Sequence, residues 1–253
     1  MFSGDKSLND HTLRSYDNEL RELRGIVARM GGLAEEQLVT ALKALREMDQ
    51  AAADEVKASD KVLDNLEHEA ERAAMVLFAR RAPVADDLRE VVAVLKMTTL
   101  IERMGDYAKN IARRAMTIAK EDPIDIPTLI EPMVDEARYM IQGSIDAFVK
   151  RDASLAVKVW EHDETLDNLH NSANRDILTD MMESPKHLGS LTHMLMIAKN
   201  LERVGDQATN IAEQVYYALT GTALEASRPK NDLTSEQLLN ADGALATTSS
   251  LPD

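Results

Sequence analysis

The chain has 253 residues, 44 of them acidic and 29 basic, so its formal net charge is -15 at pH 7. The negative field repels the phosphates of DNA and RNA, and we therefore expect no nucleic-acid partner. Hydrophobic residues make up 44% of the chain and aromatic residues 4%, with 10 glycines and 7 prolines, a composition that favours an all-α fold. The chain has no cysteine, which excludes disulfides and thiolate metal sites.

Six long helices are predicted in chain order. Amphipathic stretches cover about residues 7–48, 52–81, 84–120, 131–150, 153–182 and 186–219. Pro83 and Pro185 mark two of the turns, because proline is tolerated at the start of a helix but not inside it. No stretch approaches the ~20 apolar residues of a membrane span, and the N-terminus lacks an apolar leader. We therefore expect a cytoplasmic protein.

An internal repeat relates the first three helices to the last three. Residues 49–66 align without gaps on residues 152–169, and the block Ile101-Glu102-Arg103-Met104-Gly105-Asp106 returns 100 positions later as Leu201-Glu202-Arg203-Val204-Gly205-Asp206. Both blocks keep their order and nearly their spacing, which indicates duplication of one unit. The sequence thus predicts two three-helix bundles in tandem, at residues 1–122 and 123–220, with a disordered tail over residues 221–253.

Acidic residues recur beside the predicted buried stripe of each repeat. Glu102 and Asp106 stand one or two positions off the stripe of their helix, roughly 60–100° around it. We therefore expect the acids to flank the core rather than occupy it. An antiparallel hairpin about Pro83 would bring Asp60 opposite Asp106 and Asp64 opposite Glu102. The same construction about Pro185 pairs Asp163 with Asp206 and Asp167 with Glu202.

Four carboxylates at one level repel one another unless a cation neutralises them or some of them bind protons. Oxygen-rich clusters suit hard cations such as Mg, Mn or Ca, and iron where a histidine joins. Asn110 and Asn210 lie one turn beyond the aspartates, and His170 replaces Glu67 in the second repeat. We expect a divalent or transition metal, namely iron, zinc, manganese or magnesium. The predicted ligands are Asp60, Asp64, Glu102, Asp106, Asn110, Asp163, Asp167, His170, Glu202, Asp206 and Asn210.

A simpler interpretation treats these acids as solvated helix faces. Lys57, Lys61 and Lys109 each stand three positions from an aspartate and can pair with it. Recurrence of the acids in both repeats favours the clusters over the solvated faces. For His170, a structural role and a ligand role stay equally open.

Three features stand out beyond the repeat: the segment Arg81-Ala82-Pro83-Val84-Ala85-Asp86-Asp87-Leu88-Arg89, the segment Leu201-Glu202-Arg203-Val204-Gly205-Asp206, and the Glu-x-x-x-Asp pairs of both halves. Together they resemble the PhoU family of phosphate-transport accessory proteins. The resemblance spans about residues 10–220. It implies tandem three-helix bundles, multinuclear metal clusters, no catalysis and negative regulation of the phosphate-starvation response. The Arg-Ala-Pro-Val turn has no good copy at Glu183-Ser184-Pro185-Lys186, so any role of that turn is confined to the first half.

The same resemblance implies a link between a phosphate ABC transporter and a sensor histidine kinase. The chain would then sit at the periphery of the inner membrane, in contact with it only through these partners. We further expect a homodimer.

Two rival functions stay open. Acidic clusters also occur in carboxylate-bridged metalloenzymes, but helical di-iron enzymes use Glu-x-x-His pairs, and the nearest match is the single Asp167-x-x-His170. The second rival is a structural helical scaffold that binds no metal. We expect a protein that is not an enzyme.

Overall fold

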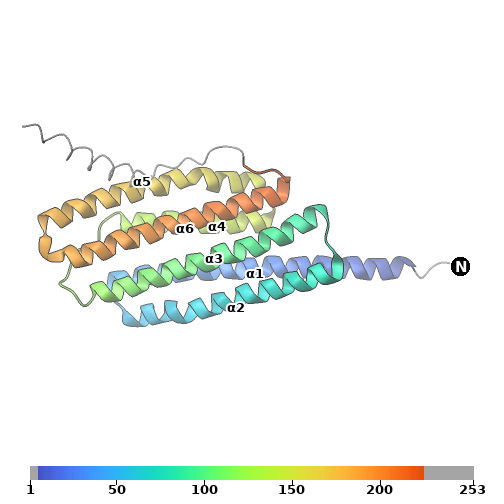
Figure 1. The fold of residues 1–253 in the computed structure, drawn as a ribbon, viewed down its shortest axis with the longest axis horizontal. Coiled ribbons are helices and arrows are strands. Elements are labelled where there is room, and N and C mark those ends of the chain that lie inside the picture. The colour runs from blue at the N-terminus through green and yellow to red at the C-terminus, as the bar shows by residue number, and fades with distance from the viewer. Residues whose placement is uncertain (1–4, 225–253) are drawn as a thin grey trace, which may run out of the picture.

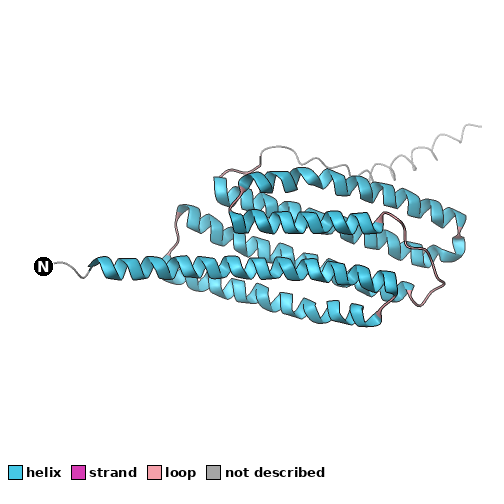
Figure 2. Ribbon diagram, turned by 180° about the vertical axis from the view of Figure 1, so that it is seen from behind, coloured by secondary structure: helices cyan, strands magenta, loops and turns pink. Residues whose placement is uncertain are grey.

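The structure is a computed structural model that describes residues 5–224, with side chains from Tyr16 onward. Every long element in this part of the chain is a helix (Figure 2), which confirms the all-α prediction. The helices are α1 (Asp5–Glu47), α2 (Gln50–Arg81), α3 (Ala85–Ile118), α4 (Ile130–Lys150), α5 (Ala153–Glu183) and α6 (Leu188–Thr220), and a short 3₁₀ turn, Pro185–His187, precedes α6. The predicted tail lies outside the described residues except for 221–224.

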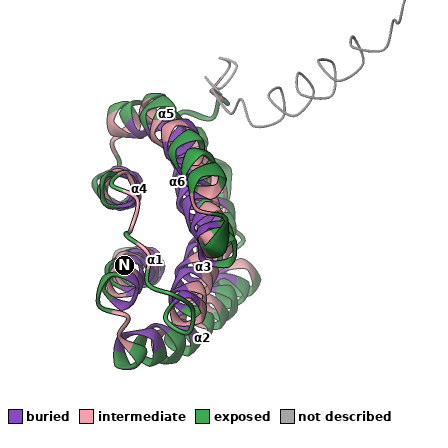
Figure 3. Cartoon of the chain, turned by 90° about the vertical axis from the view of Figure 1, so that its left-hand side faces the viewer, coloured by how far each residue is buried: buried purple, intermediate pink, exposed green. Residues whose placement is uncertain are grey.

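The helices form two layers that extend across both repeats. Seen end-on, α2, α3, α6 and α5 lie side by side in a curved layer, and α1 and α4 cover one face of it (Figure 3). The two repeats meet along α3 and α6 and along α1 and α4 (Figure 1). The buried side chains form one continuous core. Because α3 and α6 each touch three other helices, most of their circumference is in contact with protein.

The helix ends follow from local sequence signals. Asp49 precedes α2, and its side chain accepts a hydrogen bond of 2.8 Å from the amide of Ala51. Asp152, its counterpart in the repeat, caps α5 in the same way through the amide of Ser154 at 2.9 Å. Such caps satisfy amides that have no partner within the helix. At the other end, α6 stops at Gly221, whose φ of 75° is a left-handed conformation suited to glycine.

The packing of α3 on α2 depends on a glycine, and the second repeat copies it. The apolar residues of α3 that recur at intervals of three and four positions are all buried, namely Val94, Met97, Ile101, Met104, Ala108, Ile111, Ala115 and Ile118. A Cβ atom on Gly105 would lie 2.4 Å from Cδ2 of Leu63, and a Cβ atom on Gly205 would lie 2.4 Å from Cδ2 of Leu166. The missing side chain therefore lets the two helices of each hairpin approach closely. This contact lies directly beside the repeated acids.

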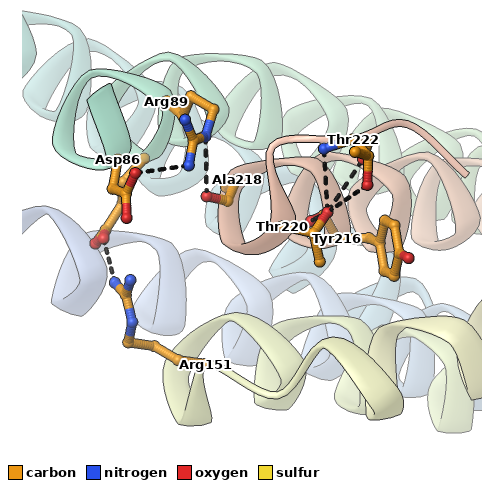
Figure 4. A network of polar contacts seen from close by, with 8 residues as sticks. Asp86, Arg89, Arg151, Tyr216, Ala218, Thr220 and Thr222 are labelled. Carbon is orange, nitrogen blue, oxygen red and sulfur yellow. Dashed lines mark hydrogen bonds and ion pairs between the residues drawn. The ribbon is translucent and has the colours of Figure 1, made fainter. Parts of the chain in front are cut away.

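A buried carboxylate joins three helices from both repeats. Glu90 of α3 accepts hydrogen bonds from Nε of Arg24 in α1 at 2.5 Å and from Arg151, which follows α4. Burial raises the pKa of Glu90, but its hydrogen bonds to the two arginines outweigh that effect and lower it. Nearby, Arg89 contacts both Asp86 and the carbonyl oxygen of Ala218, so the start of α3 lies beside the end of α6 (Figure 4).

Within residues 5–224, no helix combines the length and the apolar character needed to cross a membrane.

Candidate functional site

The first acid cluster consists of Asp60 and Asp64 from α2 with Glu102 and Asp106 from α3. Lys109 Nζ lies 2.6 Å from Asp60 Oδ2 and 2.6 Å from Asp106 Oδ1, so the structure brings this predicted pair to one lysine. Asp60 is buried, Glu102 and Asp106 are half-buried, and Asp64 is exposed. The meeting of Asp60 and Asp106 at one level of the hairpin is therefore the one that the sequence predicts.

Lys109 supplies the positive charge that the first cluster needs. Burial lowers the pKa of Lys109, but hydrogen bonds to Asp106 and Asp60 outweigh it and raise this pKa, so the ammonium stays charged. The predicted ion pair between Lys109 and Asp106 is thus present, and Lys109 also pairs with Asp60 of α2. Among the described residues, Lys57 and Lys61 form no ion pair with Asp60 or Asp64.

Glu102 lies in the negative field of the cluster. Burial raises its pKa to about 7, and repulsion from Asp106, Glu67, Asp64 and Asp60 adds to the effect. Glu67, in the turn of α2 next to Asp64, accepts a hydrogen bond of 2.8 Å from Thr99 Oγ1. A carboxyl group with such a pKa gains from either a proton or a cation near neutral pH.

The second acid cluster consists of Asp163 and Asp167 from α5 with Glu202 and Asp206 from α6. Asp163 is only 3% exposed, and Asp167 and Glu202 are buried as well. The expectation that the acids flank the core is therefore wrong for these three residues and for Asp60. Each of these acids lies on the side of its helix that meets the partner helix of the hairpin. An offset of roughly 60–100° from the apolar stripe around the helix axis therefore does not expose the side chain to solvent.

The second cluster has a different counter-charge. Lys199 Nζ lies 3.0 Å from Glu202 Oε1, and Thr209 Oγ1 donates a hydrogen bond of 3.1 Å to Asp163 Oδ1. Burial raises the pKa of Glu202 to about 7, repulsion from Asp206 adds to this effect, and Lys199 opposes it. Glu202 Oε2 is buried and accepts no hydrogen bond within the described part of the chain.

The lysine and the threonine have exchanged positions between the repeats. At an offset of 100, Lys109 corresponds to Thr209 and Thr99 corresponds to Lys199. Sequence reasoning found the acids and Lys109 but missed Lys199, Thr99 and Thr209. The same offset that aligned the acids could have found this exchange.

The remaining predicted ligands lie at the margins of the clusters. His170 is 1% exposed, and its Nε2 lies 3.0 Å from Nδ2 of Asn174, one turn further along α5. Asn110 Oδ1 accepts a hydrogen bond of 2.9 Å from Arg113. Asn210 lines a groove of about 490 Å³ between α3 and α6. Neither asparagine has a hydrogen bond to a cluster carboxylate among the bonds of the described residues.

The donors of both clusters suit a hard cation, but they are not arranged around one. Among residues 16–224, no three His, Asp or Glu side chains come close enough to form a ready metal site. The crowding that raises the pKa of Glu102 and Glu202, together with the buried Glu202 Oε2, fits a donor set that a cation would stabilise. A metal ion in the first cluster would have to displace Lys109. Metal binding stays a prediction.

The turn between α2 and α3 differs from its counterpart, as the sequence indicates. Ala82 and Ala85 both have positive φ angles, 45° and 49°, which non-glycine residues rarely adopt. Val84 between them is 73% exposed. In the second repeat, the turn forms the 3₁₀ element Pro185–His187 instead. The turn with two left-handed alanines thus exists only in the first half.

Fold and clusters together define a class: a tandem pair of three-helix units with one acid cluster at each hairpin. The PhoU domain model matches residues 27–115 and 130–215. A phosphate-specific transport system accessory protein PhoU homologue of Caulobacter vibrioides is 43% identical over 230 residues, which cover 90% of this chain and 100% of the relative. A homologue of the same name from Zymomonas mobilis is also 43% identical, over 89% of this chain and 96% of its own length.

Two solved structures match the fold. The crystal structure of PhoU from Pseudomonas aeruginosa superposes with a TM-score of 0.78 at 34% identity, covering 82% of this chain and 100% of its own. The phosphate transport system regulatory protein PhoU from Streptococcus pneumoniae gives a TM-score of 0.74 at 26% identity, with coverage of 83% and 100%. The chain therefore belongs to the PhoU family.

Proposed function

We propose that this protein is an accessory protein of a phosphate-specific transport system, where it negatively regulates the phosphate-starvation response and modulates phosphate uptake. Family membership and the printed names of its relatives support this role. Those relatives are named accessory or regulatory proteins and not enzymes, which supports a non-catalytic function.

The observation that carries the proposal is the presence of an acid cluster at the same level of both hairpins. In our proposal each cluster binds a metal ion, of iron, zinc, manganese or magnesium, and binding fixes the separation of the two helices of a hairpin. Carboxylate oxygens are suitable ligands for such ions. Glu102 and Glu202 have a pKa raised to about 7, so a cation can replace their protons near neutral pH.

The proposed partners are components of a phosphate ABC transporter and a sensor histidine kinase, which the protein would link as an adaptor. It would act in the cytoplasm, at the inner membrane through these partners, and as a homodimer. Apolar side chains at the turn between α2 and α3 support a protein-binding surface there, since Val84 is 73% exposed and Leu88, in the first turn of α3, is 40% exposed.

A genetic experiment tests the regulatory role. Deletion of the gene should derepress phosphate-starvation genes at high phosphate, and the wild-type gene should restore repression. The Val84→Asp variant should fold normally but restore repression poorly if the turn docks a partner. Normal repression in the deletion strain would contradict the proposal.

A carboxylate-bridged metalloenzyme is the rival function. Its one favouring feature is the buried His170 in the turn of α5 that follows Asp167. Metal-dependent turnover of O2 or of a phosphoester by the purified protein, lost in Asp106→Ala and Asp206→Ala, would establish this rival.

A further inference from the structure

A second feature, which adjoins the first acid cluster at Lys109, is a groove of about 420 Å³ between the start of α2 and the end of α3. We refer to it as the basic groove. Its lining includes four basic residues, Lys57, Lys109, Arg113 and Lys120. Its one acid, Asp54, accepts a hydrogen bond of 3.2 Å from Gln50 Nε2. An excess of positive charge in one concave site is unusual on a chain with a net charge of -15.

Three of these cations have no carboxylate partner. Lys57, Arg113 and Lys120 form no ion pair in the described part of the chain, and only Lys109 is held by Asp60 and Asp106. Arg113 donates to the neutral amide oxygen of Asn110 at 2.9 Å. The groove therefore holds three cations that no carboxylate of the described residues neutralises within ion-pair distance.

The second repeat shows that the fold does not require these charges. Its positions equivalent to the four basic residues are Trp160, Thr209, Glu213 and Thr220. Trp160 is buried, and its Nε1 donates a hydrogen bond of 3.1 Å to Glu213 Oε1. An aromatic ring paired with an acid thus occupies the place that Lys57 and Arg113 occupy in the first repeat. Of two copies of one hairpin, only the first carries the cationic groove.

We infer that the basic groove binds a small phosphate-bearing anion, such as a nucleotide or pyrophosphate. Lysine and arginine are the side chains that recognise phosphoryl oxygens, and the side-chain amide NH2 of Asn110 adds a neutral donor. Ala53 and Met116 offer apolar contact to the remainder of the ligand. The volume suits a small molecule, whereas the net negative charge repels extended polyanions and anionic membranes.

Isothermal titration calorimetry on the full chain in EDTA tests this inference with orthophosphate, pyrophosphate and ATP as probes. We expect at least one of them to bind. The double variant Lys57→Gln, Arg113→Gln should weaken that binding about tenfold or more. The matched control Arg72→Gln, Lys186→Gln removes two exposed charges outside the groove and should stay within about twofold of wild type. Thermal unfolding of each variant verifies its fold.

The probes also separate the possible sources of the phosphate. Tighter binding of ATP than of pyrophosphate supports further contacts, of the third phosphate or of the nucleoside with Ala53 and Met116, and equal binding supports recognition of a diphosphate group alone. Three results would overturn the inference. They are no binding of any probe at millimolar concentration, equal losses in the groove and control variants, and tighter binding of an acidic peptide than of ATP and pyrophosphate.

Discussion

The two acid clusters descend from one unit but neutralise their charge differently. In the first, Lys109 extends from α3 and bridges Asp60 and Asp106 on two helices. In the second, Thr209 stands in its place, and Lys199 pairs with Glu202 on its own helix. The acids and their level are common to both repeats, whereas the position of the cation is not. The repeated feature is therefore the group of carboxylates and not a fixed ion pair.

The largest effect we expect concerns the helix contact that both clusters share. Gly105→Val and Gly205→Val should each lower the free energy of unfolding by about 3 kcal/mol, because the new side chain overlaps Leu63 or Leu166 in a packed core. Gly25→Ala, where no atom lies within 4 Å of the added carbon, should instead raise stability by about 0.5–1 kcal/mol. Urea unfolding followed by circular dichroism measures all three. If Gly105→Val were as stable as wild type, the close packing of the two helices would not depend on the glycine.

The next largest effect is a difference between the two clusters in the loss of stability when their lysine is removed. Lys109→Met should destabilise the metal-free protein by about 2 kcal/mol, because the buried Asp60 loses its charged partner. Lys199→Met should cost about 1 kcal/mol or less, since Glu202 can bind a proton instead. Added Mn²⁺ should restore more stability to Lys109→Met than to Lys199→Met. Thermal unfolding measures both losses. A larger loss for Lys199→Met than for Lys109→Met would show that the roles given to the two lysines are wrong.

The pH dependence of stability concerns the two glutamates. The folded-state pKa of Glu202 is about 7, above its ordinary value of 4.5, so the folded protein retains a proton that the unfolded chain has lost. Its contribution to stability is therefore present below pH 4.5 and declines as the pH rises to about 7. In EDTA, Glu202→Gln should be more stable than wild type at pH 8 by roughly 1–3 kcal/mol. Glu102→Gln should change in the same direction by less, because Glu102 is more exposed.

Glu183→Gln, at an exposed position, is the control for this pH series. It should follow the wild-type profile. A Glu202→Gln profile parallel to that of wild type between pH 4 and pH 8 would mean that Glu202 keeps an ordinary pKa.

Much of the arrangement follows from the sequence. Helical periodicity predicts the six helices, and the repeat with its turn at Pro83 predicts that Asp60 and Asp106 meet. The burial of Asp163 and Glu202 could not be predicted from the sequence. It depends on how closely the two helices of a hairpin approach each other and on the packing of α6 against three helices. The reach of Lys109 across to α2 depends on side-chain conformation, which helical phase does not fix.

The basic groove illustrates the same limit. Lys57 and Arg113 are 56 positions apart in the sequence and read there as two solvated charges. Only the antiparallel packing of α2 and α3 places them in one groove. Comparison of the repeats could have singled them out, since Trp160 and Glu213 are unlike them in size or charge.

Elemental analysis tests the central claim that the paired acid clusters bind metal ions. Protein purified without chelator should contain iron, zinc, manganese or magnesium above the level of a mock preparation. The quadruple variant Glu102→Gln, Asp106→Asn, Glu202→Gln, Asp206→Asn should lose that metal while it keeps its helical circular dichroism spectrum. Wild-type protein with no metal above background, or a quadruple variant that retains all of it, would contradict the account.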